Sequence, residues 1–189
     1  MHPIEQYGPI HGTTILAVRH NGKVVLAGDG QVSMNNMVIK HQARKVRRIY
    51  NDQILVGFAG ATADALTLSE RLEAKLERFN GNLTRSAVEL AREWRTDRVL
   101  KRLEALMLAA DPQKLFLLSG TGDIIEPDEG VIGIGSGGVA AQAAATALIR
   151  NTAMDARQVA QAAMQIASAL CVYTNDHLTM EELTCHAES

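Results

Sequence analysis

Two adjacent threonines near the start of the chain have side chains that could do chemistry. Thr13 and Thr14 follow Gly12 and open the first apolar run of the sequence. If the chain is cut before Thr13, the hydroxyl gains a free α-amine in the same residue. This amine has an ordinary pKa of roughly 7.7 to 8.0, so it can accept the hydroxyl proton near neutral pH. Such a threonine would attack a carbonyl group without a histidine. A threonine pair that merely begins a strand is the simpler alternative.

An acid and a lysine form a second set of candidate residues. Asp29 ends an apolar run between two glycines, and Lys45 lies in the basic run 44–48. A lysine beside a hydroxyl would favour its deprotonated form, while the acid would hold and orient the lysine. Each residue also has a plain structural explanation, namely a turn aspartate and a solvated strand edge. The alternation of the strand leaves open whether Lys45 or Arg47 points inward.

Two glycine-rich turns could complete such a site. Gly60 stands between an apolar strand and a helix, where backbone N–H groups can face a developing oxyanion, although a plain turn is the alternative. Ser136 lies in the stretch 133–138, which has the G-x-G-x-x-G form of a dinucleotide-binding turn. A nucleotide site is disfavoured because the acid at the expected distance, Asp155, begins a helix and too little chain remains for further βα units. These glycines more simply let the backbone approach another group closely, with Ser136 at a helix N-terminus.

The apolar pattern predicts the elements that must position these residues. Strands are expected over 13–19, 24–28, 44–50, 53–59, 114–119, 131–135 and 171–174, and helices over 61–79, 84–109, 139–151 and 155–170. Asn21-Gly22 between two apolar runs indicates a hairpin, Asp155 is expected to cap its helix, and the chain turns polar from residue 175. Paired strands and paired helices predict a layered α+β fold, with helices on both outer faces of two stacked sheets.

Composition narrows the class of protein. The 189 residues are 47% hydrophobic but only 4% aromatic, which predicts one domain with an aliphatic, alanine-rich core. A net charge of -2 gives no overall attraction to nucleic acid, and no apolar run approaches the roughly 20 residues of a membrane span. Residues 1–12 do not resemble a secretory signal and are expected to be an accessible leader. Cys171 and Cys185 are too few for a disulfide framework, so the cytoplasm is the expected location.

Six stretches, in order along the chain, resemble one known family. They are Thr13-Thr14-Ile15, GDGQ (28–31), RKVRR (44–48), GFAGATAD (57–64), WRTDR (94–98) and GIGSGG (133–138). Together they closely resemble the HslV (ClpQ) family of bacterial proteasome-like threonine peptidases, and the resemblance runs from Thr13 to about Leu183. It implies an N-terminal-nucleophile hydrolase with a four-layer αββα sandwich. Residues 1–12 would be a propeptide, and residues 13–189 a single peptidase domain with a short polar tail from about residue 184.

The resemblance also implies a role for each candidate residue. Thr13 would be the nucleophile with its own amine as general base, and Lys45 would be the electrostatic activator with Asp29 as its partner. Gly60 would donate to the oxyanion, and Ser136 would be a supporting hydroxyl near the amine.

Partners and cofactors follow from the same resemblance. The family forms two stacked hexameric rings with the threonines facing an inner chamber. Its partner HslU (ClpY) is a hexameric ATPase that unfolds protein substrates, feeds them in and activates the peptidase allosterically. ATP would be used by HslU only, and no organic cofactor, nucleic acid or membrane is implied. A structural sodium ion would be held through backbone oxygens of Ser168, Cys171 and Thr174.

Three departures from the family pattern bear on these expectations. Ser168 stands where glycine is common, which a backbone-carbonyl ligand tolerates, and Val139-Ala140 replaces the usual Pro-Tyr, which could alter subunit packing or the shape of the pocket. Twelve residues precede Thr13, where many members have only the initiator methionine, so self-cleavage between Gly12 and Thr13 is expected. Two alternatives stay open, a small-molecule amidase of the same fold and a non-catalytic ring scaffold.

Overall fold

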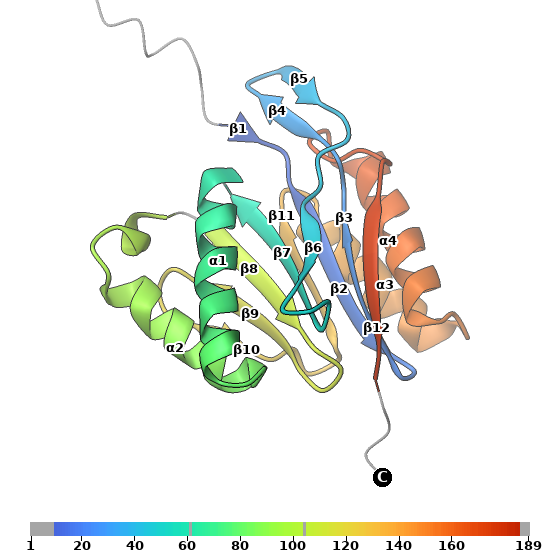
Figure 1. The fold of residues 1–189 in the computed structure, drawn as a ribbon. Coiled ribbons are helices and arrows are strands. Elements are labelled where there is room, and N and C mark those ends of the chain that lie inside the picture. The colour runs from blue at the N-terminus through green and yellow to red at the C-terminus, as the bar shows by residue number, and fades with distance from the viewer. Residues whose placement is uncertain (1–9, 61, 104, 186–189) are drawn as a thin grey trace, which may run out of the picture.

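Two stacked sheets, each covered on its outer face by a pair of helices, make up the fold (Figure 1). The computed structural model describes residues 10–60, 62–103 and 105–185. One sheet has the strand order β11 (Val131–Gly135), β2 (Thr14–His20), β3 (Lys23–Gly28) and β12 (Thr179–Thr184). The other has the order β10 (Ile124–Ile125), β9 (Leu115–Ser119), β8 (Ala105–Ala110), β7 (Ile54–Gly60) and β6 (Val46–Ile49). A third, small sheet has the order β1 (Ile10–His11), β4 (Val32–Met34) and β5 (Met37–Lys40).

The helices lie on opposite outer faces of this sandwich. Helices α1 (Thr62–Arg78) and α2 (Leu83–Thr96) cover the five-stranded sheet, and α3 (Gly138–Asn151) and α4 (Ala156–Leu170) cover the four-stranded sheet. The predicted four-layer αββα sandwich is therefore confirmed. Among the residues that the structure describes, no helix combines the length and hydropathy needed to cross a bilayer.

Strand β2 shows why the sequence must form this sandwich. Its side chains alternate between the two faces of the sheet, as the pleat of a strand requires. Leu16 and Val18 pack in the cluster under α3 and α4, whereas Ile15 and Ala17 pack between the two sheets, and all four are fully buried. A strand that is apolar on both faces is stable only where both faces are covered. Strand β7 follows the same rule, which confirms the prediction made from its continuous apolar run.

Several local predictions hold in the structure. Asn21 and Gly22 both have positive φ angles, 48° and 74°, and join β2 to β3 in a two-residue hairpin. Asp155 caps α4 in a capping box with Gln158, because its carboxylate accepts from the Gln158 N–H and the Gln158 side chain accepts from the Asp155 N–H. The break expected after α1 is confirmed by Asn80, which has a positive φ of 51°.

Two predictions about elements are wrong. The helix expected over 84–109 ends at Thr96, and after a 3₁₀ turn at Leu100–Arg102 the chain forms β8 in the middle of the five-stranded sheet. The strand expected over 171–174 is a turn, and the polar segment after it contains β12, which pairs with β3 along the edge of the four-stranded sheet.

Candidate active site

Thr13 lies directly before β2 and lines a pocket of about 310 Å³ at the end of the two sheets. The same pocket is lined by Gly12, Lys45, Arg47 and Gly60. Gly60 is the last residue of β7, is exposed and has a φ of 137°. Residues that are far apart in the sequence thus meet around Thr13. A single site formed by the candidate residues requires this arrangement.

The carbonyl of Thr13 is held by the glycine-rich turn between β11 and α3. The Ser136 N–H donates to the Thr13 carbonyl oxygen at 2.8 Å. Gly135, whose φ is 85°, lies so close that a Cβ there would be 1.9 Å from that oxygen. The glycines therefore permit a close backbone approach, as predicted, and the approaching group is the backbone of the threonine itself. Ser136 is exposed beside Thr13, and its backbone makes the contact that fixes the threonine.

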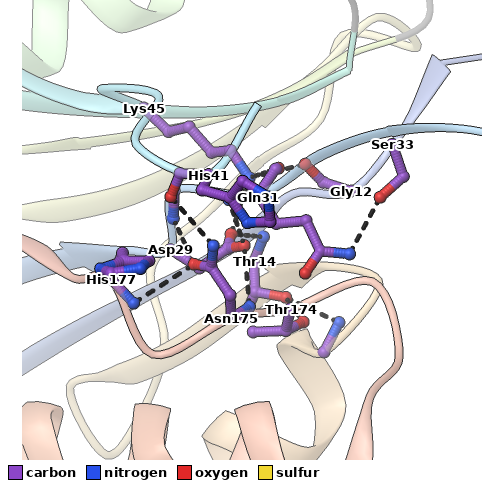
Figure 2. A network of polar contacts seen from close by, with 12 residues as sticks. Gly12, Thr14, Asp29, Gln31, Ser33, His41, Lys45, Thr174, Asn175 and His177 are labelled. Atoms are coloured by element: carbon purple, nitrogen blue, oxygen red, sulfur yellow. Dashed lines mark hydrogen bonds and ion pairs between the residues drawn. The ribbon is translucent and has the colours of Figure 1, made fainter. Parts of the chain in front are cut away.

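Asp29 is the fully buried anchor of the site, shown with its neighbours in Figure 2. Its Oδ1 accepts from the Thr14 N–H at 2.8 Å and from Lys45 Nζ at 2.7 Å. Its Oδ2 accepts from the Gln31 N–H at 3.0 Å and from the Asn175 N–H at 3.3 Å. Four donors on two oxygens satisfy a buried carboxylate well. Asp29 thus ties the residue after Thr13 to the lysine, which is the partnership predicted from the sequence.

Lys45 lies one residue before β6 and has only 8% of its side chain exposed. Its ammonium donates to Asp29 and also to the carbonyl oxygens of Gly12, at 2.6 Å, and Gln31, at 2.5 Å. Burial, the largest influence, lowers the pKa of Lys45 below its ordinary value, and the charge of Asp29 and its hydrogen bond oppose that shift. The question left open by strand alternation is thereby answered: Lys45 contacts the acid, while Arg47 is half-buried at the pocket wall.

The sequence did not predict the contacts of three polar residues of the site: Thr14 was noted only as half of the threonine pair, Thr174 only as a sodium ligand through its backbone, and Asn175 only as the start of the polar segment. Thr14 is buried, and its hydroxyl accepts from the Gly137 N–H at 2.9 Å and lies 2.7 Å from the Thr174 hydroxyl. Asn175 follows Thr174 and reaches back to Asp29. These partners are more than 100 residues apart along the chain, so no spacing rule could pair them. The one available hint was a pair of polar residues, Thr174 and Asn175, a few residues after an apolar helix.

The residues expected to hold sodium lie at the end of α4 and in the turn after it. Ser168 is in the last turn of the helix, and the Cys171 carbonyl accepts from the Thr174 N–H at 3.0 Å. The last carbonyls of a helix lack intrahelical donors and form its negative end, so a cation held by backbone oxygens fits this position. Among the described residues, no three His, Cys, Asp or Glu side chains are grouped as metal ligands would be.

Comparisons with known proteins agree with this geometry. The family model described as "Proteasome subunit" matches residues 10–183. The chain is 62% identical over 174 residues to the ATP-dependent protease subunit HslV of Syntrophobacter fumaroxidans, covering 92% of this chain and 97% of that protein.

Solved structures give the same answer. The crystal structure of eukaryotic HslV from Trypanosoma brucei superposes with a TM-score of 0.86 at 47% identity, covering 90% of this chain and 99% of that one. Thiobacillus denitrificans BPH, whose structure is also known in complex with epoxomicin, shares the fold alone: its TM-score is 0.70 at 16–17% identity, over 92–93% of this chain and all of that one. The chain therefore belongs to the proteasome family of threonine peptidases, and within that family to the HslV peptidases.

Proposed function

We propose that Thr13 is the nucleophile of an HslV-type peptidase and that the chain first cleaves itself before this residue. As a member of the HslV peptidases, the chain is the proteolytic subunit of an ATP-dependent protease. The observation that supports the assignment to Thr13 is the position of Lys45, whose ammonium joins the buried Asp29 to the carbonyl oxygen of Gly12, the residue just before the threonine.

Self-cleavage would use the hydroxyl and the lysine already in place. The Thr13 oxygen attacks the Gly12 carbonyl carbon, and Lys45 stabilises the negative charge that develops on the carbonyl oxygen 2.6 Å away. The C–N bond then breaks, the hydroxyl proton passes to the nitrogen, and the acyl group remains on the Thr13 oxygen as an ester. Water hydrolyses the ester to release residues 1–12 with a Gly12 carboxylate and leaves Thr13 with a free amine.

Hydrolysis of substrates would repeat the attack on a new carbonyl. The amine of Thr13 takes the hydroxyl proton, the charge of Lys45 favours the alkoxide, and Asp29 holds Lys45 in place. Gly60 lines the same pocket and would donate its N–H to the oxyanion, while the hydroxyl of Ser136 would contact the amine. The ordinary pKa of a free α-amine is roughly 7.7 to 8.0, so such a base needs no histidine.

Assembly and partners are proposals that rest on membership of the family. We propose two stacked hexameric rings, activation by the ATPase HslU, and unfolded proteins as substrates. A sodium ion would bind through backbone oxygens of Ser168, Cys171 and Thr174 and stiffen the turn after α4. A cytoplasmic location agrees with the use of ATP by the partner and with two free cysteines, Cys171 and Cys185.

Intact-mass spectrometry together with Thr13→Ala tests the proposal. The wild-type protein is expected to lose the mass of residues 1–12, and Thr13→Ala to keep that mass and to lose hydrolysis of a casein-like substrate in the presence of HslU and ATP. An active preparation that retains residues 1–12 would refute the proposed processing. Activity on small amides but not on protein chains would instead indicate an amidase, and an uncleaved, unreactive assembly would indicate a scaffold.

A further inference from the structure

Asn175 lies where three segments of the site meet, in the connection between α4 and β12 (Figure 2). Its side-chain oxygen accepts from the Gly30 N–H at 3.0 Å and from the His177 N–H at 3.3 Å. Its side-chain nitrogen donates to the His41 carbonyl at 2.9 Å. Its backbone N–H donates to Asp29 Oδ2. The half-buried side chain of Asn175 thus joins Gly30, just after β3, to the segment before β6, and its backbone N–H binds the buried carboxylate.

The segment that Asn175 holds is the one that delivers Lys45. Residues 41–45 have no regular secondary structure and run from β5 to β6. These residues lie close against Gly30, because a Cβ added at Gly30 would be only 2.2 Å from the His41 carbonyl oxygen. The Ala43 N–H also donates to the Gly30 carbonyl oxygen at 2.9 Å. The side-chain amide of Asn175 holds the same two segments together, because it hydrogen-bonds the Gly30 N–H and the His41 carbonyl at once.

Asn175 therefore acts on both members of the lysine–aspartate pair. Its backbone fixes the oxygen of Asp29 that faces away from Lys45, and its side chain fixes the segment from which Lys45 extends. A lysine has a long, flexible side chain, so the position of its ammonium depends on how firmly its backbone and its acceptors are held.

We propose that Asn175 is a positioning residue for peptide-bond hydrolysis, which clamps the 41–45 segment to Gly30 and Asp29 so that Lys45 stays at Thr13. The inference rests on the proposed function, because it takes Thr13 and Lys45 as the reacting pair. Asn175 acts through them and does not itself touch the reacting atoms.

Two substitutions separate this role from simple stabilisation. Asn175→Asp keeps the shape and the acceptor for Gly30 and His177 but loses the donor to His41, and Asn175→Ala loses all three side-chain bonds. Both are expected to lower kcat per folded protein by about 10-fold, with KM within about twofold, because a small misplacement of a catalytic group slows chemistry more than binding. The rate of loss of residues 1–12 should fall in parallel. Asp176→Asn, at an exposed neighbour, is the matched control and should leave all these rates unchanged.

The pH profile gives a second readout, in opposite directions for the two variants. The charged groups around Lys45 are Asp29, Lys40 on β5, Arg44 and Arg47, and the amine of Thr13 after cleavage. In Asn175→Ala, looser pairing with Asp29 lowers the pKa of Lys45, so the alkaline limb of kcat moves to lower pH. In Asn175→Asp, the added negative charge raises that pKa and moves the limb to higher pH. A purely structural role would lower the melting temperature without moving the limb of Asn175→Ala, which adds no charge.

The outcomes distinguish this inference from the function on which it rests. Wild-type kcat in both Asn175 variants and an unmoved alkaline limb in Asn175→Ala, with Thr13→Ala inactive, would overturn the inference alone. An active Thr13→Ala would overturn the proposed function. A parallel loss of kcat and self-cleavage in folded Asn175→Asp, with Asp176→Asn normal, is the result expected.

Discussion

The two helical layers of the molecule are packed with different side chains. The layer of α1 and α2 is filled by leucines together with Phe58, Phe116 and Trp94, whereas the layer of α3 and α4 is filled largely by alanines. Small residues let a helix lie close to the sheet beneath it, while large ones bury more apolar area. The first layer therefore contributes more to stability, and the second leaves less room for movement.

The alanine layer contributes polar contacts to the site from both of its helices. The turn into α3 holds the carbonyl of Thr13, and the turn after α4 supplies Thr174 and Asn175. The leucine layer supplies Gly60, at the junction of β7 with α1. We infer that tight packing of small side chains serves precision at the nucleophile, and that bulky packing serves the free energy of folding. The four predictions below test this division, from the largest expected effect to the smallest.

Gly135→Ala should nearly abolish both self-cleavage and hydrolysis. A methyl group at this position would lie 1.9 Å from the Thr13 carbonyl oxygen, which is backbone and cannot move without displacing Thr13, the proposed nucleophile. We expect a loss of at least about 100-fold in kcat, measured by peptide hydrolysis and intact mass. The control is Gly122→Ala, between β9 and β10 of the five-stranded sheet. The φ angle of Gly122 is similarly positive, 92°, but the atom nearest to an added methyl group belongs to the flexible Arg95 side chain. Normal self-cleavage in Gly135→Ala would contradict the close approach.

Leu72→Ala should destabilise the protein strongly and leave its chemistry intact. Leu72 is fully buried in the leucine layer, so the substitution removes apolar contacts and leaves a cavity. We expect a loss of about 2–5 kcal/mol in the free energy of unfolding, with kcat per folded molecule within about twofold. Urea denaturation and active-site titration would measure the two quantities. Leu66→Ala, at a residue 44% exposed on the same helix, is the control. A large fall in kcat would show that this layer also positions the site.

Ala163→Leu should lower kcat more, and the free energy of unfolding less, than Leu72→Ala does. Ala163 is fully buried on α4, so extra methylene groups must push the helix from the sheet, at a cost of about 1–3 kcal/mol. The turn with Thr174 and Asn175 would move with the helix, and kcat should fall several-fold more than in Leu72→Ala. Ala169→Leu, on the exposed side of the same helix, should change neither quantity. The comparison between the layers fails if Ala163→Leu loses stability but keeps its kcat.

The caps of α4 and α2 should respond differently to acid. Hydrogen bonding to the Gln158 N–H, the largest influence, lowers the pKa of Asp155 below its ordinary value. A depressed pKa means that the cap stabilises above the pKa of the unfolded chain, and that this contribution is lost as pH falls through the folded pKa. Asn82, which caps α2, does not titrate. Hydrogen exchange between pH 5 and 3 should therefore show α4 loosening before α2, and Asp155→Asn should remove the difference.

The sequence alone predicted most of the fold where local chemistry decides the structure. The Asn21-Gly22 hairpin, the Asp155 cap and the double apolar face of β7 are properties of short segments. Strand β8 was wrongly predicted as helix because both its faces are buried, so its apolar residues also match helical spacing.

Strand β12 was missed for the opposite reason. It is an edge strand whose glutamates form ion pairs, Glu181 with Arg48 and Glu182 with Arg157, so its composition resembled that of a tail. The same contrast applies to the site. Thr13, Asp29 and Lys45 stand in motifs that a reader can recognise, whereas Asn175 becomes visible only when the fold brings β3 and the segment before β6 to the end of α4.

The proposed self-cleavage would change the covalent chemistry of Thr13 with little need for movement. The carbonyl of Thr13 is bound by Ser136 and the next N–H by Asp29, so the threonine is held from its C-terminal side before residues 1–12 leave. The proposed cleavage would break the bond on the N-terminal side of Thr13 and would free the Lys45 N–H that now donates to Gly12 for the carbonyl of a substrate. If the proposed self-cleavage occurs, the Gly12 carbonyl held by Lys45 would be the first carbonyl that Thr13 attacks.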